Sequence, residues 1–149
     1  MTAGPQTSTT GRQTATTGRA VGWGVVVGIA QVGVAFGFWW LDPATVLAAM
    51  VALIVAVYIG FAVSDGRPQV IVVESIVVAA FFIAAAVAIE VTPWFLVALY
   101  LAHGAKDLWQ HRYQFVNGTR WWPPFCCAVD ITVASIIAAQ IVLGVEFHA

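Results

Sequence analysis

Charged residues are scarce in this chain: of its 149 residues, 9% are charged and 61% are hydrophobic. Six Lys and Arg residues stand against seven Asp and Glu residues, so the composition offers no excess of positive charge to bind a phosphate backbone. The only cysteines, Cys126 and Cys127, are adjacent and provide no disulfide framework. The composition therefore excludes a nucleic-acid partner and predicts an integral membrane protein whose partner is the lipid bilayer.

Several signatures of membrane chemistry are also missing. Three histidines are too few for a His-box desaturase, and the chain has no G-x-S-x-G elbow, no H-E-x-x-H pair and no P-loop. It also lacks the paired Asp-rich boxes that hold a diphosphate through magnesium. The familiar hydrolase, metalloprotease, ATPase and prenyltransferase mechanisms are thereby excluded.

What the chain does have is long apolar runs. A helix needs about 20 apolar residues to cross a bilayer, and continuous runs of this length favour helices over strands. Prolines mark the expected helix starts, where a missing N–H costs least. We predict an all-α membrane protein, a bundle of about five transmembrane helices, at residues 20–41, 44–63, 70–89, 94–113 and 125–145.

The first 19 residues are rich in Thr and Gly and contain no apolar cluster, which predicts a disordered tail ahead of a single transmembrane domain over 20–149. Basic residues fall only in the tail and in alternate loops, whereas Asp42, Glu90 and Glu146 lie in the opposite connections. Because basic residues are retained on the cytoplasmic side, we expect a multi-pass protein of the cell membrane with its N-terminus inside and its C-terminus outside.

Aromatic and small residues also follow the expected spans. The tryptophans lie near the span ends, as an interfacial belt requires; they are Trp23, Trp39, Trp40, Trp94, Trp109, Trp121 and Trp122. The first span carries two small-xxx-small pairs, Gly24 with Gly28 and Gly33 with Gly37. These glycines predict close helix packing, either within this bundle or in a homo-oligomer.

The most informative residues are the ionisable ones inside the spans, because each costs roughly 2.5 to 3.5 kcal/mol on insertion. On the fourth span they recur every three or four residues and form one polar stripe. Neighbouring spans add carboxylates at similar depth, which predicts one polar pocket on the cytoplasmic side. Its candidate residues are Glu74, His103, Asp107, His111 and Asp130.

Two imidazoles and three carboxylates form a mixed nitrogen and oxygen ligand set that suits a divalent ion such as Zn, Mn or Fe. The two histidines are about 12 Å apart along the helix, so they share one site only by pointing toward each other. A network of compensated charges explains the same residues without any metal. Cys126 or Cys127 is either a soft ligand or a small buried apolar residue.

The segments HGAKDLWQHR and WWPPFCCAVD together resemble a pattern found in a group of small bacterial integral-membrane proteins of unassigned activity. The resemblance covers residues 103–130 and implies that His103, Asp107, His111, Asp130 and one of the two cysteines are the positions to test first. It implies no reaction, cofactor or substrate.

Three functions of different classes remain open. The first, which the residues favour, is a structural or accessory membrane protein whose polar pocket is a packing network. The second is a metal-dependent membrane enzyme that acts on a lipid-like substrate. The third is a proton or metal-ion carrier that uses the same polar stripe.

Overall fold

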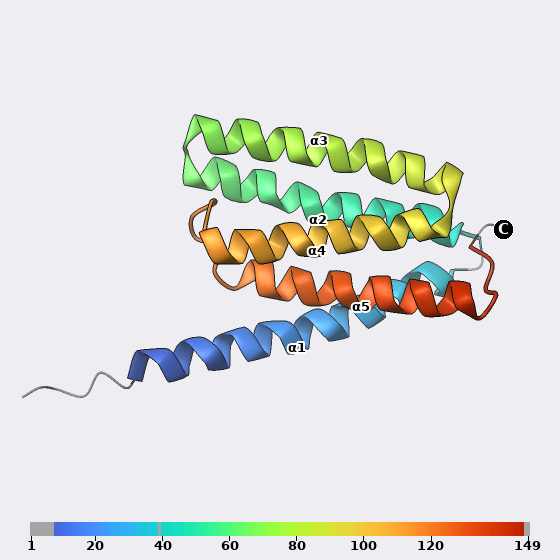
Figure 1. Ribbon diagram of the computed structural model, residues 1–149, viewed down its shortest axis with the longest axis horizontal. Coiled ribbons are helices and arrows are strands. Elements are labelled where there is room, and N and C mark those ends of the chain that lie inside the picture. Colours follow the sequence, from blue (N-terminus) through green and yellow to red (C-terminus); the bar gives the residue numbers. More distant parts are fainter. Residues whose placement is uncertain (1–7, 39, 148–149) are drawn as a thin grey trace, which may run out of the picture.

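The computed structural model describes the backbone of residues 8–38 and 40–147 and the side chains from residue 16 onward. Within these residues the secondary structure is five helices: α1 (Ser8–Gly37), α2 (Pro43–Asp65), α3 (Pro68–Val91), α4 (Pro93–Tyr113) and α5 (Trp122–Val142). The predicted all-helical fold is therefore confirmed. The helices run up and down along one long axis, with α4 in contact with α2, α3 and α5, and α1 packed mainly on α5 (Figure 1).

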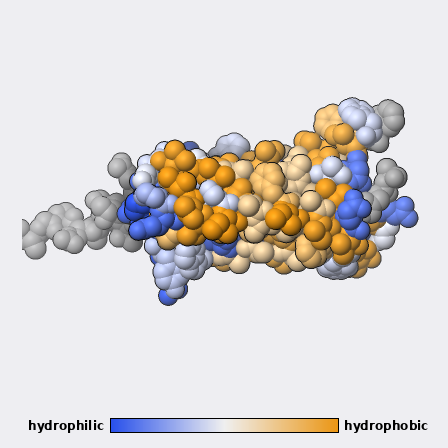
Figure 2. Space-filling view, turned by 90° about the horizontal axis from the view of Figure 1, so that it is seen from above, coloured by the Kyte–Doolittle hydropathy of each residue, from blue (hydrophilic) through white to orange (hydrophobic). Residues whose placement is uncertain are grey.

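Four of these helices, α1, α2, α3 and α5, are long and apolar enough to cross a membrane. The fourth helix, α4, is not among them, because polar and charged residues fill its C-terminal half. In the space-filling view an apolar band covers the middle of the molecule and hydrophilic residues gather toward its two ends (Figure 2). Such a distribution fits a protein embedded in a bilayer.

Helix boundaries follow the prolines, as predicted. Pro43, Pro68 and Pro93 are the first residues of their helices, and Pro123 is the second residue of α5. The first turn of α2 is capped by Asp42, whose side chain accepts a hydrogen bond of 2.7 Å from the backbone N–H of Thr45. This helix ends at Gly66, whose φ of 79° is the left-handed conformation that glycine adopts without strain.

The prediction for the N-terminal tail was wrong over residues 8–19, which are helical and extend α1 beyond the bundle (Figure 1). No proline interrupts the chain between Pro5 and Pro43, and adding a turn to an existing helix is easier than nucleating one. The apolar segment thus extends its helix into the Thr-rich sequence. Residues 1–7 of the predicted tail and Trp39 of the predicted aromatic belt lie outside the described residues.

The glycines of α1 divide into two pairs with different surroundings. A Cβ atom on Gly24 would lie 2.7 Å from the Cβ of Ala128, and one on Gly28 would lie 2.9 Å from the Cβ of Thr132. These two glycines therefore allow the close approach of α1 to α5. A Cβ on Gly33 or Gly37 would meet nothing within 4 Å, so only this second pair is open to another molecule.

Candidate functional site

The candidate site lies between α4 and α5, about 12 Å along α5 from its start at Trp122. His103 and Asp107 are one turn apart on α4, so their side chains leave the same face of the helix. Asp130 faces them from α5, and all three residues are fully buried. A Cβ on Gly104 would stand 3.4 Å from the Cβ of Asp130, so this glycine permits the close contact of α4 with α5.

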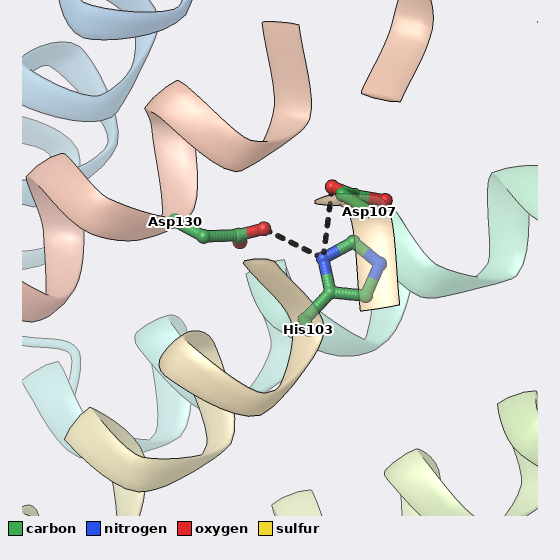
Figure 3. A group of neighbouring side chains, drawn as sticks. All are labelled: His103, Asp107 and Asp130. Atoms are coloured by element: carbon green, nitrogen blue, oxygen red, sulfur yellow. Dashed lines mark hydrogen bonds and ion pairs between the residues drawn. The ribbon is translucent and has the colours of Figure 1, made fainter. Parts of the chain in front are cut away.

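One nitrogen of the His103 imidazole, Nδ1, faces both carboxylates (Figure 3). This nitrogen is 2.8 Å from Oδ2 of Asp130, which is a hydrogen bond, and 3.7 Å from Oδ2 of Asp107. The ring also has edge contacts with two aromatic side chains, Phe81 at 5.6 Å and Tyr58 at 6.1 Å between ring centroids. These rings keep water away from the imidazole, so the charges around it interact in a medium of low polarity.

Several polar atoms of the site have no hydrogen-bond partner among the described residues. They are Oδ2 of Asp107, Oδ1 of Asp130 and Nε2 of His103, each of them buried. Because a buried polar atom is costly without a partner, and nearly all such atoms in folded proteins have one, these three need an explanation. Two of them are carboxylate oxygens, which either a proton kept on an aspartate or a bound cation would satisfy.

The other oxygen of Asp107 is satisfied by α2. The hydroxyl of Tyr58 donates to Oδ1 of Asp107 over 2.6 Å, and both side chains are fully buried. The ammonium group of Lys106 stands 3.3 Å from the centre of the Tyr58 ring and forms an ion pair of 2.9 Å with Oε2 of Glu74 on α3. A continuous line of polar contacts thus crosses the bundle from α3 to α5.

The end of the bundle next to the site is closed by the loop between α4 and α5, residues 114–121. Val116 and Thr119 of this loop are fully buried, and Nε2 of Gln110 donates to the carbonyl oxygen of Val116 over 3.2 Å. Asp65 and Arg67 hold the loop in place from outside: Arg67 donates to the carbonyl oxygen of Phe115 over 2.6 Å, and Asp65 accepts from the backbone N–H of Asn117 over 2.8 Å. The Asp65 carboxylate also raises the pKa of Arg67 above its ordinary value.

The structure brings together three of the five residues predicted for the pocket. The ligand atoms of His103, Asp107 and Asp130 all lie within 4.8 Å of one another. Glu74 is buried but reaches the others only through Lys106 and Tyr58, whereas His111 is exposed in the last turn of α4. Among the described residues, Cys126 and Cys127 are buried thiols outside this ligand group.

Tyr58 is the residue of the site that the sequence did not reveal. Its phenol carries no charge, and tyrosine occurs in apolar spans for its ring alone, so nothing marked this hydroxyl as special. One signal was available. Tyr58 lies in the interior of α2, whereas the tryptophans stand near helix ends, and a buried hydroxyl needs a hydrogen-bond partner.

The three clustered side chains could together hold a metal ion. A four-coordinate ion with bonds of about 2.0–2.1 Å holds its ligand atoms about 3.3 Å apart. The distances of 2.8 Å and 3.7 Å from Nδ1 to the two carboxylates lie on either side of that value. The ligand atoms of the two carboxylates also lie within 4.8 Å of each other, so the three side chains must draw together to hold an ion.

No protein-family model matches this chain, and no curated protein or solved structure is similar to it.

Proposed function

We propose that this chain is an integral membrane protein that binds one divalent transition-metal ion between α4 and α5, with His103, Asp107 and Asp130 as its ligands. The observation that carries the proposal is the convergence of the three ligand atoms within 4.8 Å at complete burial. Oδ2 of Asp107 belongs to this group and has no hydrogen-bond partner among the described residues, and a metal ion would satisfy it.

Charge balance favours a divalent ion. In their ordinary ionised forms Glu74, Asp107 and Asp130 bring three negative charges into the bundle, and Lys106 brings one positive charge. With a neutral imidazole the sum is two negative charges, and uncompensated charge is very costly inside a membrane protein. One divalent cation would make the buried group neutral, and in its absence protonation of both aspartates would do the same.

The ligand types narrow the choice of ion to Zn, Mn or Fe, because one imidazole and two carboxylates form a mixed nitrogen and oxygen set. Three protein ligands leave at least one coordination position open, which is the pattern of catalytic metal sites and not of purely structural ones. A metal-dependent enzyme acting on a lipid-like substrate is the reaction class that this pattern supports.

Elemental analysis of the purified protein tests the proposal without needing a substrate. We expect about one Zn, Mn or Fe per chain, lost in His103→Ala and in Asp107→Ala, because each change removes one of three ligands. His111→Ala is the matched control: it removes a histidine from the same helix at an exposed position and should keep the metal. A wild-type protein without stoichiometric metal would rule out the proposed function.

A structural or accessory role is the second candidate, and a specific observation favours it. The hydrogen bonds of 2.8 Å from His103 to Asp130 and of 2.6 Å from Tyr58 to Asp107 form a packing network without any ion. A metal-free protein that folds normally and tolerates both alanine changes is the result expected for this role.

We further propose that α4 is a fifth transmembrane span of a multi-pass cell-membrane protein, with the N-terminus inside and the C-terminus outside. All six basic residues support this orientation, because they belong to the N-terminal part of α1, the α2–α3 turn, the last two turns of α4 and the loop that follows it. The opposite end of the bundle carries Asp42, before α2, and Glu90, in the last turn of α3, and no basic residue. In this orientation the metal site lies in the cytoplasmic half of the bundle.

A further inference from the structure

The hydroxyl of Tyr58 contacts one of the three proposed metal ligands, Asp107. It occupies Oδ1 of Asp107 at 2.6 Å and leaves Oδ2 of the same carboxylate on the side of His103 and Asp130. Oδ2 is the oxygen without a hydrogen-bond partner among the described residues. One oxygen of this carboxylate therefore accepts the hydrogen bond from Tyr58, and the other remains available to a metal ion.

We propose that Tyr58 determines the metal specificity of the site, by holding Asp107 to coordination through a single oxygen and so favouring a four-coordinate ion such as Zn²⁺. This inference rests on the proposed metal-binding function. Zn²⁺ is almost always satisfied by four ligand atoms, whereas larger ions that prefer oxygen take six or more and use bidentate carboxylates to reach that number. A carboxylate restricted to one oxygen disfavours those larger ions.

Tyr58 can act in this way only if its own position is fixed, and burial together with two contacts fixes it. The side chain is fully buried, its ring has Lys106 at 3.3 Å on one face, and Phe61 meets it in an edge contact at 6.1 Å. Lys106 is in turn held by Glu74 at 2.9 Å. Glu74 and Lys106 are thus positioning residues, which orient a ligand through Tyr58 and do not touch the ion.

The experiment compares Zn²⁺ and Mn²⁺, each added alone, on the purified full-length chain and on Tyr58→Phe. We expect the substitution to weaken Zn²⁺ binding by about 10- to 100-fold, the usual effect of losing a partner of a metal ligand. Mn²⁺ binding should weaken less, because Oδ1 of Asp107 becomes available as an extra ligand atom. The ratio of the two dissociation constants should therefore shift toward Mn²⁺.

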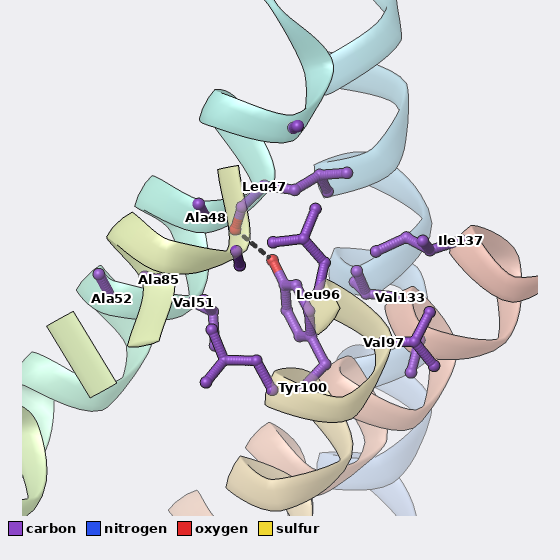
Figure 4. Packing of buried hydrophobic residues seen from close by; sticks show 14 of the residues in the cluster. Leu47, Ala48, Val51, Ala52, Ala85, Leu96, Val97, Tyr100, Val133 and Ile137 are labelled. Atoms are coloured by element: carbon purple, nitrogen blue, oxygen red, sulfur yellow. Dashed lines mark hydrogen bonds between the residues drawn. The ribbon is translucent and has the colours of Figure 1, made fainter. Parts of the chain in front are cut away.

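Tyr100→Phe is the matched control. Tyr100 is also fully buried, and its hydroxyl donates over 2.9 Å to the carbonyl oxygen of Leu47 in the apolar core, not to one of the three proposed ligands (Figure 4). This variant removes a buried phenol oxygen at equal cost in hydrogen bonding and should leave the ratio of the two dissociation constants unchanged. Thermal unfolding of each variant without metal reports whether the bundle remains folded.

The outcomes separate the two proposals. A wild-type chain that binds neither ion overturns the proposed function, and the specificity role falls with it. A wild-type chain that binds Zn²⁺, with Tyr58→Phe changing both ions equally or neither, overturns the specificity role alone. The visible absorption of wild-type protein loaded with Co²⁺ needs no variant: intense bands of a four-coordinate ion are expected, and weak bands of a six-coordinate ion would contradict the inference.

Discussion

Asp107 and Asp130 reach the same histidine from different helices and differ in how they are held. Asp130 bonds directly to Nδ1 of His103, whereas Asp107 bonds to Tyr58 and has its second oxygen 3.7 Å from Nδ1. The three clustered residues could be predicted from the sequence because ionisable groups in apolar spans are rare and need partners. The role of Tyr58 could not be predicted, because the sequence does not show which residue of another helix its hydroxyl contacts after packing.

For His111, the helical spacing alone did not predict whether the side chain is buried. It lies eight residues beyond His103, so it is about 80° around α4 and about two turns farther along. At that point α4 is in its last turn, and the side chain is exposed. The spacing identified the face of the helix, but the depth of packing decided which of its residues are buried.

The contact of His103 with Asp130 makes a prediction at the same scale. Asp130→Leu should destabilise the protein by about 3 kcal/mol, because it leaves a buried imidazole nitrogen without its partner. Asp130→Asn keeps the shape and can keep one hydrogen bond, so its cost should be smaller. Both changes should abolish metal binding. The measurement is denaturant unfolding in detergent micelles, and a loss under about 1 kcal/mol for Asp130→Leu would argue against a tight pair.

At the scale of elements, α4 is the least apolar helix and also the one that touches α2, α3 and α5. Neighbours on three sides bury its polar residues and supply partners for some of their polar atoms. Five helices could be predicted from the sequence because prolines and charged residues lie at the helix ends. The start of α1 could not be predicted, because no helix-breaking proline separates the Thr-rich segment from the apolar one. Composition alone does not show how far a helix extends.

The packing of α1 on α5 predicts opposite effects for two glycines of one helix. In Gly28→Ala the new Cβ would stand 2.9 Å from the Cβ of Thr132 and 3.0 Å from the carbonyl oxygen of Val129, so α1 must move away from α5. We expect a loss of about 1–3 kcal/mol in unfolding free energy from this overpacking.

Gly33→Ala is the control for the preceding change. Its Cβ would meet nothing within 4 Å, so the substitution should be neutral or stabilise α1 by up to about 1 kcal/mol through helix propensity. Thermal unfolding of the two variants in the same detergent gives the comparison. If Gly33→Ala were the more harmful change, the open face of α1 would have to be a contact with a second copy of the chain.

At the scale of the whole molecule, the two ends of the bundle differ in charge. The α2–α3 turn and the α4–α5 loop carry Arg67 and Arg120, whereas the opposite end carries Asp42, Glu90 and Glu146. The candidate site is nearer the first end, separated from it by the loop that buries Val116 and Thr119. The sequence showed this polarity, but it did not show that the loop closes the end of the bundle, because Val116 differs in no visible way from a lipid-facing valine.

The proposed orientation predicts which loops react with a thiol reagent that does not cross membranes. In intact cells Val145→Cys should be labelled and Asn117→Cys should not, because we expect the C-terminal end outside and the α4–α5 loop inside. Both positions are exposed in the bundle, and the native Cys126 and Cys127 are buried, so the wild-type chain serves as the background control. Labelling of Asn117→Cys alone would reverse the proposed topology.

The division of the ligands between α4 and α5 has a consequence for biosynthesis. His103 and Asp107 leave the ribosome before Asp130, so for a time α4 holds two ionisable ligands without the helix that completes the set. At that stage Asp107 and Lys106 already have partners on α2 and α3, and the arrival of α5 supplies Asp130, the third ligand of the proposed metal site. Metal loading should therefore be a late step of maturation, and a chain halted before Trp122 should be recognised by quality-control proteases as unfinished.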